Sequence, residues 1–128
     1  MNVFSKPILA IAFGAFLVCA ETCRHFDALL SLPEHWASLP IHDWIAGAYL
    51  VYAGVRSRRP GRPAAGPHLL AAWAFNLSLL CGALLGHLED WSSQAPSDRL
   101  EFALIGAIAL LFLIALGGLV SALDTVRR

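Results

Sequence analysis

Apolar residues gather into four long runs that short polar segments separate. The runs cover approximately residues 7–25, 40–57, 68–88 and 101–123. A run of roughly 20 apolar residues matches the hydrocarbon thickness of a bilayer and is far longer than a buried strand needs. The pattern predicts an all-α integral membrane protein, an up-down four-helix transmembrane bundle in which residues 1–128 form a single domain.

The second run is the shortest, because residues 41–55 rise only roughly 22 Å as a helix. It can still cross a bilayer if His42 and Asp43 lie at one interface and the arginines that follow the run snorkel at the other. Asp43 in the first turn would also complement the positive end of the helix dipole. We therefore expect a fourth span here.

The first run has an alternative interpretation as a cleavable secretory signal. Lys6, a short apolar stretch and the segment 18–20 resemble such a signal. The helical period, however, continues as far as His25. We expect an uncleaved first helix.

Charged residues divide unequally between the two ends of the predicted bundle. One end carries most of the cations, and the loops at the other end carry most of the acids. The cations are Lys6, Arg56, Arg58, Arg59, Arg62, Arg127 and Arg128, and the acids are Asp27, Glu34, Glu89, Asp90 and Asp98. By the positive-inside rule both termini are expected to be cytoplasmic, as in a multi-pass protein of a bacterial-type inner membrane. Trp36, Trp44 and Trp91 then fall at the outer interface, where amphipathic rings collect.

Composition agrees with this picture and excludes some functions. Of the 128 residues, 58% are hydrophobic and 14% charged, which leaves no segment for a separate soluble domain. The formal net charge is zero, so no basic field indicates a nucleic-acid partner. The expected partners are the lipid bilayer and either further copies of the chain or a larger membrane complex.

Small residues recur at helical spacing on three of the predicted helices. Ala10 and Gly14 form one seam, Gly47 and Gly54 a second, and Ser78, Gly82 and Gly86 a third. Small residues let helix backbones approach closely in lipid. These seams either close the bundle internally or mediate oligomers, and we expect internal packing.

Ionisable groups collect at the outer ends of all four predicted helices. A metal site there would draw on six of them, Glu21, His25, His42, Asp43, His87 and Glu101. Imidazole and carboxylate together suit zinc, copper, nickel or iron. Alternatively, His25 and His87 would be the axial pair of a b-type haem. Helix ends at an interface are wet, so the same residues also fit an ordinary interfacial role, in which Glu21 pairs with Arg24.

Asn76 lies deep in the third run, on the same helix stripe as His87. Intramembrane polar groups tend to face the bundle interior, where they hydrogen-bond neighbouring helices. The chain has no HExxH, CxxC or CxxCH motif and no glycine-rich phosphate loop, so an enzyme is not the expected function.

Three functions remain open from the residues. The first, which is the function that we expect, is an accessory or interaction subunit of a membrane complex or homo-oligomer. The second is a protein that binds a transition metal or haem through the outer histidines and carboxylates. The third is a small oligomeric transporter that couples to ions or protons through Glu21 or Asn76.

Overall fold

The computed structural model describes residues 5–30, 40–59, 65–93 and 99–127. Within these ranges the chain is helical and has no strand. Four long helices are α1 (Ser5–Arg24), α3 (Ile41–Ser57), α4 (Ala65–Ser93) and α5 (Arg99–Val126), and a short helix, α2 (Phe26–Leu30), follows α1. The predicted all-helical character is therefore confirmed.

Three of the long helices are long and apolar enough to cross a membrane. The qualifying segments are Lys6–Arg24, Gly66–Asp90 and Phe102–Asp124. Their outward faces carry large exposed apolar side chains, among them Ile8, Leu110 and Leu113. Such faces are stable in lipid, which supports a membrane protein. Helix α3, with 17 residues, is shorter than these three.

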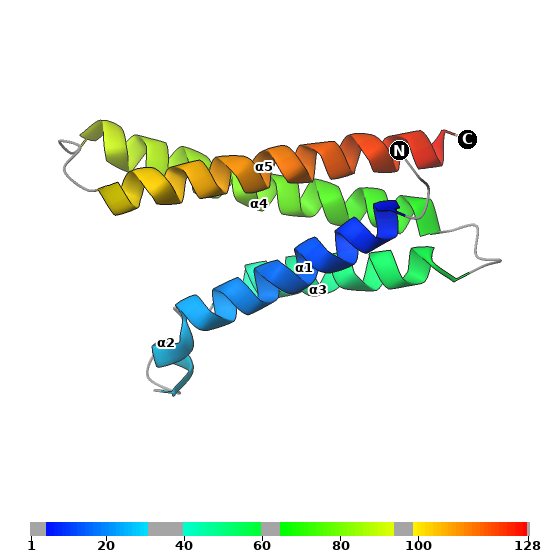
Figure 1. Cartoon of the computed structure of the whole chain (residues 1–128), viewed down its shortest axis with the longest axis horizontal. Coiled ribbons are helices and arrows are strands. Elements are labelled where there is room, and N and C mark those ends of the chain that lie inside the picture. The colour runs from blue at the N-terminus through cyan, green and yellow to red at the C-terminus, as the bar shows by residue number, and fades with distance from the viewer. Residues whose placement is uncertain (1–4, 31–39, 60–64, 94–98, 128) are drawn as a thin grey trace.

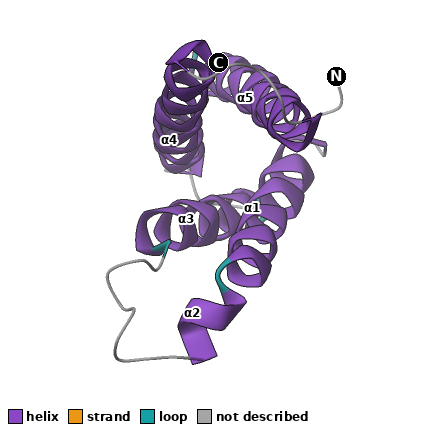
Figure 2. Cartoon of the chain, turned by 90° about the vertical axis from the view of Figure 1, so that its left-hand side faces the viewer, coloured by secondary structure: helices purple, strands orange, loops and turns teal. Residues whose placement is uncertain are grey.

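The long helices pack as two pairs. Helix α1 lies beside α3, and α4 lies beside α5 (Figure 1). The pairs meet through α3 against α4 and, to a smaller extent, through α1 against α5 (Figure 2). They lie close together at the end that holds both termini and diverge toward the end that holds α2 (Figure 1).

The core fills the half of the bundle where the pairs converge. Trp73 of α4 is buried against Phe13 of α1, with ring centroids 5.3 Å apart. Leu50 of α3 is also fully buried, and a side chain at Gly118 of α5 would overlap the Trp73 indole. All four long helices thus meet around one tryptophan.

Two of the predicted small-residue seams are inside the fold. A Cβ atom built on Gly14 would lie 2.5 Å from the carbonyl oxygen of Gly47, and one on Gly47 would lie 2.8 Å from the carbonyl oxygen of Gly14. Gly54 in turn faces the backbone of Pro7. The prediction of internal packing is confirmed for the seams of α1 and α3.

The prediction is wrong for the seam of α4. Ser78, Gly82 and Gly86 are exposed, and a Cβ atom at either glycine would meet nothing within 4 Å. The opposite face of α4, which carries Trp73 and Asn76, is the face that packs on the bundle. Bulky side chains hold this face of α4 against its neighbours, because they fill the core where the two pairs converge.

Candidate functional site

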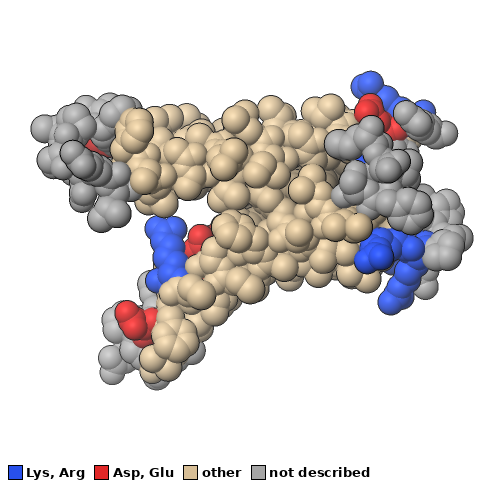
Figure 3. Space-filling model, viewed as in Figure 1, with Lys and Arg blue, Asp and Glu red and all other residues tan. Residues whose placement is uncertain are grey.

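A cavity of about 270 Å³ lies between the helix pairs, in the half where they diverge. Figure 3 shows the opening between the pairs, with basic and acidic side chains beside it. All four long helices contribute to its lining. These residues are Phe16, Leu17, Ala20, Glu21 and Arg24 of α1, Asp43 of α3, Asn76, Leu79, Leu80, Ala83 and His87 of α4, and Leu104, Ala107, Ile108 and Leu111 of α5.

The walls of the cavity are apolar. Phe16 and Leu17 of α1, Leu80 of α4, and Ile108 and Leu111 of α5 contribute to them. These side chains make no directional bonds, so they accept an apolar body of suitable volume without specifying its chemistry. Any chemical selectivity must come from the polar residues.

Among the described residues, four ionisable side chains line the cavity toward the α2 end of the bundle, Glu21, Arg24, Asp43 and His87. Glu21 has one carboxylate oxygen 3.7 Å from Nη1 of Arg24 and the other 3.5 Å from Nε2 of His25. Asp43 and His87 also line the cavity, and Asp43 has no ion pair among the described side chains. Two carboxylates therefore face one guanidinium, which favours a ligand that brings a cation or a hydrogen-bond donor.

Asn76 lies at the deep end of the cavity. It sits eleven residues before His87 on α4, which corresponds to a depth of about 16 Å along the helix. The side chain is 1% exposed, and its amide nitrogen donates to the carbonyl oxygens of Ala46, at 3.0 Å, and Ala72, at 2.9 Å. The bond to Ala46 ties α4 to α3, as the sequence predicts for a polar residue inside a membrane bundle.

The amide oxygen of Asn76, unlike the amide nitrogen, makes no hydrogen bond to a described residue. Oδ1 is buried and has no hydrogen-bond partner among the described residues. The amide cannot turn over to exchange its two ends, because the oxygen would then face two carbonyl oxygens and both donated bonds would be lost. Asn76 lines the cavity, and its Oδ1 is thus a fixed, buried acceptor without a donor, which is costly.

The cavity ends near Asn76. Beyond it toward the termini lie Trp73, Leu69 and Ala72 of α4, all buried. Phe13 and Leu50 pack there from the other helix pair. The polar groups consequently face a chamber that the apolar core closes on one side.

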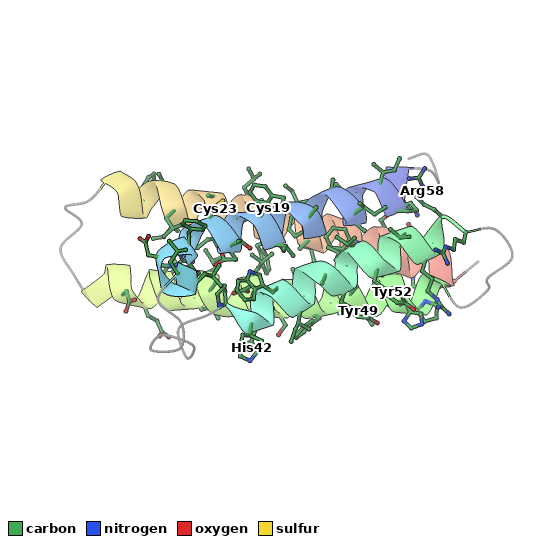
Figure 4. All side chains as sticks on the ribbon, turned by 90° about the horizontal axis from the view of Figure 1, so that it is seen from below. Cys19, Cys23, His42, Tyr49, Tyr52 and Arg58 are labelled. Carbon is green, nitrogen blue, oxygen red and sulfur yellow. The ribbon has the colours of Figure 1, made fainter. Side chains whose placement is uncertain are left out.

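The structure gathers some of the predicted site residues and separates others. Glu21, Asp43, His87 and Asn76 line the same cavity. His25 contacts Glu21 and is not part of the lining, whereas His42 is exposed and points away from the bundle (Figure 4). The side chain of Glu101 lies outside the described residues.

No group of three or more His, Cys, Asp or Glu side chains comes close enough to hold a metal ion in the part of the chain that the structure describes. Only His87 of the predicted haem pair lines the cavity. The metal and haem sites therefore remain predictions from the sequence pattern.

Sequence reasoning missed two features of the site. Arg24 was expected only as a partner for Glu21, although it is one of few cations at the acidic end and so a candidate for the cavity. The apolar wall from α5 carries no signal in the sequence, because Leu104, Ile108 and Leu111 look like any leucine-rich span.

Comparisons with protein-family profiles, curated proteins and solved structures find no match to this chain.

Proposed function

We propose that the chain is a four-span membrane protein with both termini on the cytoplasmic side. The three long apolar helices support the membrane location, and the pairing of α3 with α1 supports a fourth span. Helix α3 has 17 residues, with Asp43 in its first turn and Arg56 in its last. A helix of that length rises about 25 Å, and polar residues at both ends can reach the two interfaces.

Within that architecture, we propose that the protein binds a small amphipathic molecule whose polar group donates hydrogen bonds. The buried Oδ1 of Asn76, which has no donor among the described residues and belongs to a side chain that lines an apolar cavity, carries the proposal. The ligand class is a primary amine or an alcohol on a short apolar chain. A protonated amine suits the cavity best, because Glu21 and Asp43 together exceed the charge of Arg24.

Binding accounts for the cavity better than ion or proton transport does. A transport path must continue from the cavity to the other side of the membrane. Trp73, Phe13 and Leu50 form a packed apolar core on that route. A chamber that is open toward one end and closed at the other holds a ligand and conducts nothing in this conformation.

Titration of the purified full-length chain in nanodiscs with octylamine tests the proposal. Trp73 lies one helical turn from Asn76, so its fluorescence is expected to report occupancy of the cavity. Ala83→Phe, which fills the cavity, is expected to weaken octylamine binding by about tenfold or more, equivalent to about 1.4 kcal/mol. Asn76→Leu, which removes the acceptor, is expected to weaken it similarly.

The matched control is Ala74→Phe, the same change on an exposed position of α4 outside the cavity lining. It is expected to leave the affinity within about twofold of the parent. Octanol should bind more weakly than octylamine, and octanoate more weakly still. Equal affinities for the three head groups, or equal loss in Ala74→Phe and Ala83→Phe, would contradict the proposal.

A second candidate is an accessory or interaction subunit, in a homo-oligomer or a larger membrane complex. The outward position of Ser78, Gly82 and Gly86 favours it, because the bundle itself leaves this seam uncovered. Seams of this kind allow two helices to approach closely in lipid. The two functions are compatible, since the cavity and the seam lie on different faces of α4.

A further inference from the structure

A second hollow, of about 180 Å³, lies at the opposite end of the bundle, near the termini. Tyr52, Val55, Arg56 and Arg59 line it. Tyr52, Val55 and Arg56 share one face of the last turns of α3, and Arg59 follows two residues after the helix ends. None of the described residues that line this hollow is a carboxylate.

Tyr52 and Arg56 are held in place by contacts with each other and with α4. Nη1 of Arg56 donates to the Tyr52 hydroxyl at 2.9 Å, and the guanidinium carbon lies 5.9 Å from the ring centroid. His68 of α4 approaches the Tyr52 ring edge-on, with centroids 6.0 Å apart. The hydroxyl of Tyr49 lies 3.3 Å from Nδ1 of the same histidine.

Three side chains around this hollow carry a hydrogen-bond donor that no described residue accepts. Nε of Arg56 is buried without a partner among the described residues. The Tyr52 hydroxyl accepts a bond from Arg56, so its own proton is free to be donated. Arg59 is exposed and supplies a second guanidinium. Donors from three side chains around two positive charges fit an oxyanion with several acceptor oxygens, and guanidinium groups match phosphate well.

We propose that Tyr52, Arg56 and Arg59 bind the phosphate of an anionic phospholipid head group. The apolar neighbour favours a lipid over free phosphate, because Val55 is 41% exposed beside the donors and can contact an acyl chain. Arginines after a membrane span usually fix its topology, and that role needs only their charge. It does not explain a guanidinium Nε that is buried without an acceptor.

The experiment counts lipids bound to the full-length chain by native mass spectrometry in neutral detergent. The probes are phosphatidylglycerol, phosphatidylcholine and inorganic phosphate. Phosphatidylglycerol is expected to bind at one site, and the double variant Arg56→Gln/Arg59→Gln to raise its Kd about tenfold or more. Tyr52→Phe, which keeps the ring and removes the hydroxyl, is expected to raise the Kd by a smaller factor.

Arg58→Gln is the matched control. Arg58 is exposed and lies on the other side of α3 from Tyr52 (Figure 4). This change is expected to leave the Kd within about twofold. A loss in Arg58→Gln equal to that of the double variant Arg56→Gln/Arg59→Gln, or equal binding of phosphatidylcholine, would overturn the proposal. Displacement of the lipid by equimolar inorganic phosphate would assign the site to free phosphate and overturn the lipid assignment.

Discussion

At the scale of single residues, Gly14 and Gly47 set the distance between α1 and α3. Each glycine faces the backbone carbonyl of the other, so neither position has room for a side chain. The close approach brings the two backbones into van der Waals contact, which is the main source of attraction between helices in lipid. The pair that holds Glu21, Arg24 and Asp43 depends on this contact.

Gly14→Ala is expected to destabilise the bundle by about 1–3 kcal/mol, the usual cost of overpacking. The new methyl group would lie 2.5 Å from the Gly47 carbonyl oxygen, and backbone atoms cannot move aside cheaply. The measurement is reversible unfolding in mixed detergent and dodecyl sulfate micelles.

The control for this prediction is Gly82→Ala, at a position where a Cβ atom meets nothing within 4 Å. Helix propensity alone favours alanine there by up to about 1 kcal/mol, so this variant should be no less stable than the parent. A Gly14→Ala variant as stable as Gly82→Ala would show that the helices are not held by this contact.

The polar residues of the cavity were largely predictable from the sequence. Asn76 and His87 share a stripe of one helix, and an amide within an apolar run has few stable positions other than the bundle interior. The position of His42 outside the cavity lining was not predictable in this way. It neighbours Asp43, and only the rotation of α3 about its axis decides which of the two faces the cavity.

At the scale of elements, α3 decides the topology of the chain. It is the shortest of the long helices and the one that does not reach the length of a clear membrane span. If α3 crosses, the end of α1 and the end of α5 lie on opposite sides of the membrane. If it does not cross, the two ends lie on the same side.

Cysteine labelling separates these topologies. Cys23 is exposed at the end of α1, and a second thiol can be placed at the exposed end of α5 by Arg127→Cys. With Cys19 and Cys81 replaced by serine, we expect a membrane-impermeant maleimide to label Cys23 in intact cells. Position 127 should react only after the membrane is opened.

Reaction of both positions in intact cells would mean that α3 lies outside the bilayer. Reaction of position 127 alone would instead show that the orientation of the chain in the membrane is opposite to the proposed one. A variant with Cys23 as its single cysteine and with Arg127 unchanged is the control, because its labelling comes from Cys23 alone.

Helix existence was the most predictable feature at this scale, and helix pairing the least. Four apolar runs gave four long helices, because a backbone in lipid must satisfy its hydrogen bonds internally. The glycines of α1 and α3 indicated close packing, and the structure pairs them. The similar seam of α4 gave the opposite result, since spacing alone does not distinguish an internal surface from an external one.

At the scale of the whole molecule, the uncovered α4 seam predicts self-association. Gly82→Leu is expected to shift the purified protein toward a smaller assembly in light scattering, because the larger side chain separates helices that meet there. Gly106→Leu is the control, at an exposed glycine of α5 with equally open space. A parent protein that is monomeric in nanodiscs would contradict this prediction.

The cavity itself belongs to this scale and could not be derived from the sequence. Its size depends on the angle between the two helix pairs, which is the outcome of packing among Phe13, Trp73 and Gly118. Small differences in side-chain shape change such angles. The amino-acid composition of each helix does not predict how these side chains fit together, and therefore does not predict the angle between the pairs.

The divergence of the two pairs also gives the molecule a tapered outline, narrow at the terminal end and broad at the α2 end (Figure 1). A tapered protein occupies a larger cross-sectional area in one leaflet than in the other. The free energy of the protein in the membrane therefore depends on membrane curvature. A ligand that holds the pairs apart would strengthen the taper, and a membrane curved to suit the taper would in return bind the ligand more tightly. Occupancy of the cavity and local membrane curvature are thus expected to be thermodynamically linked.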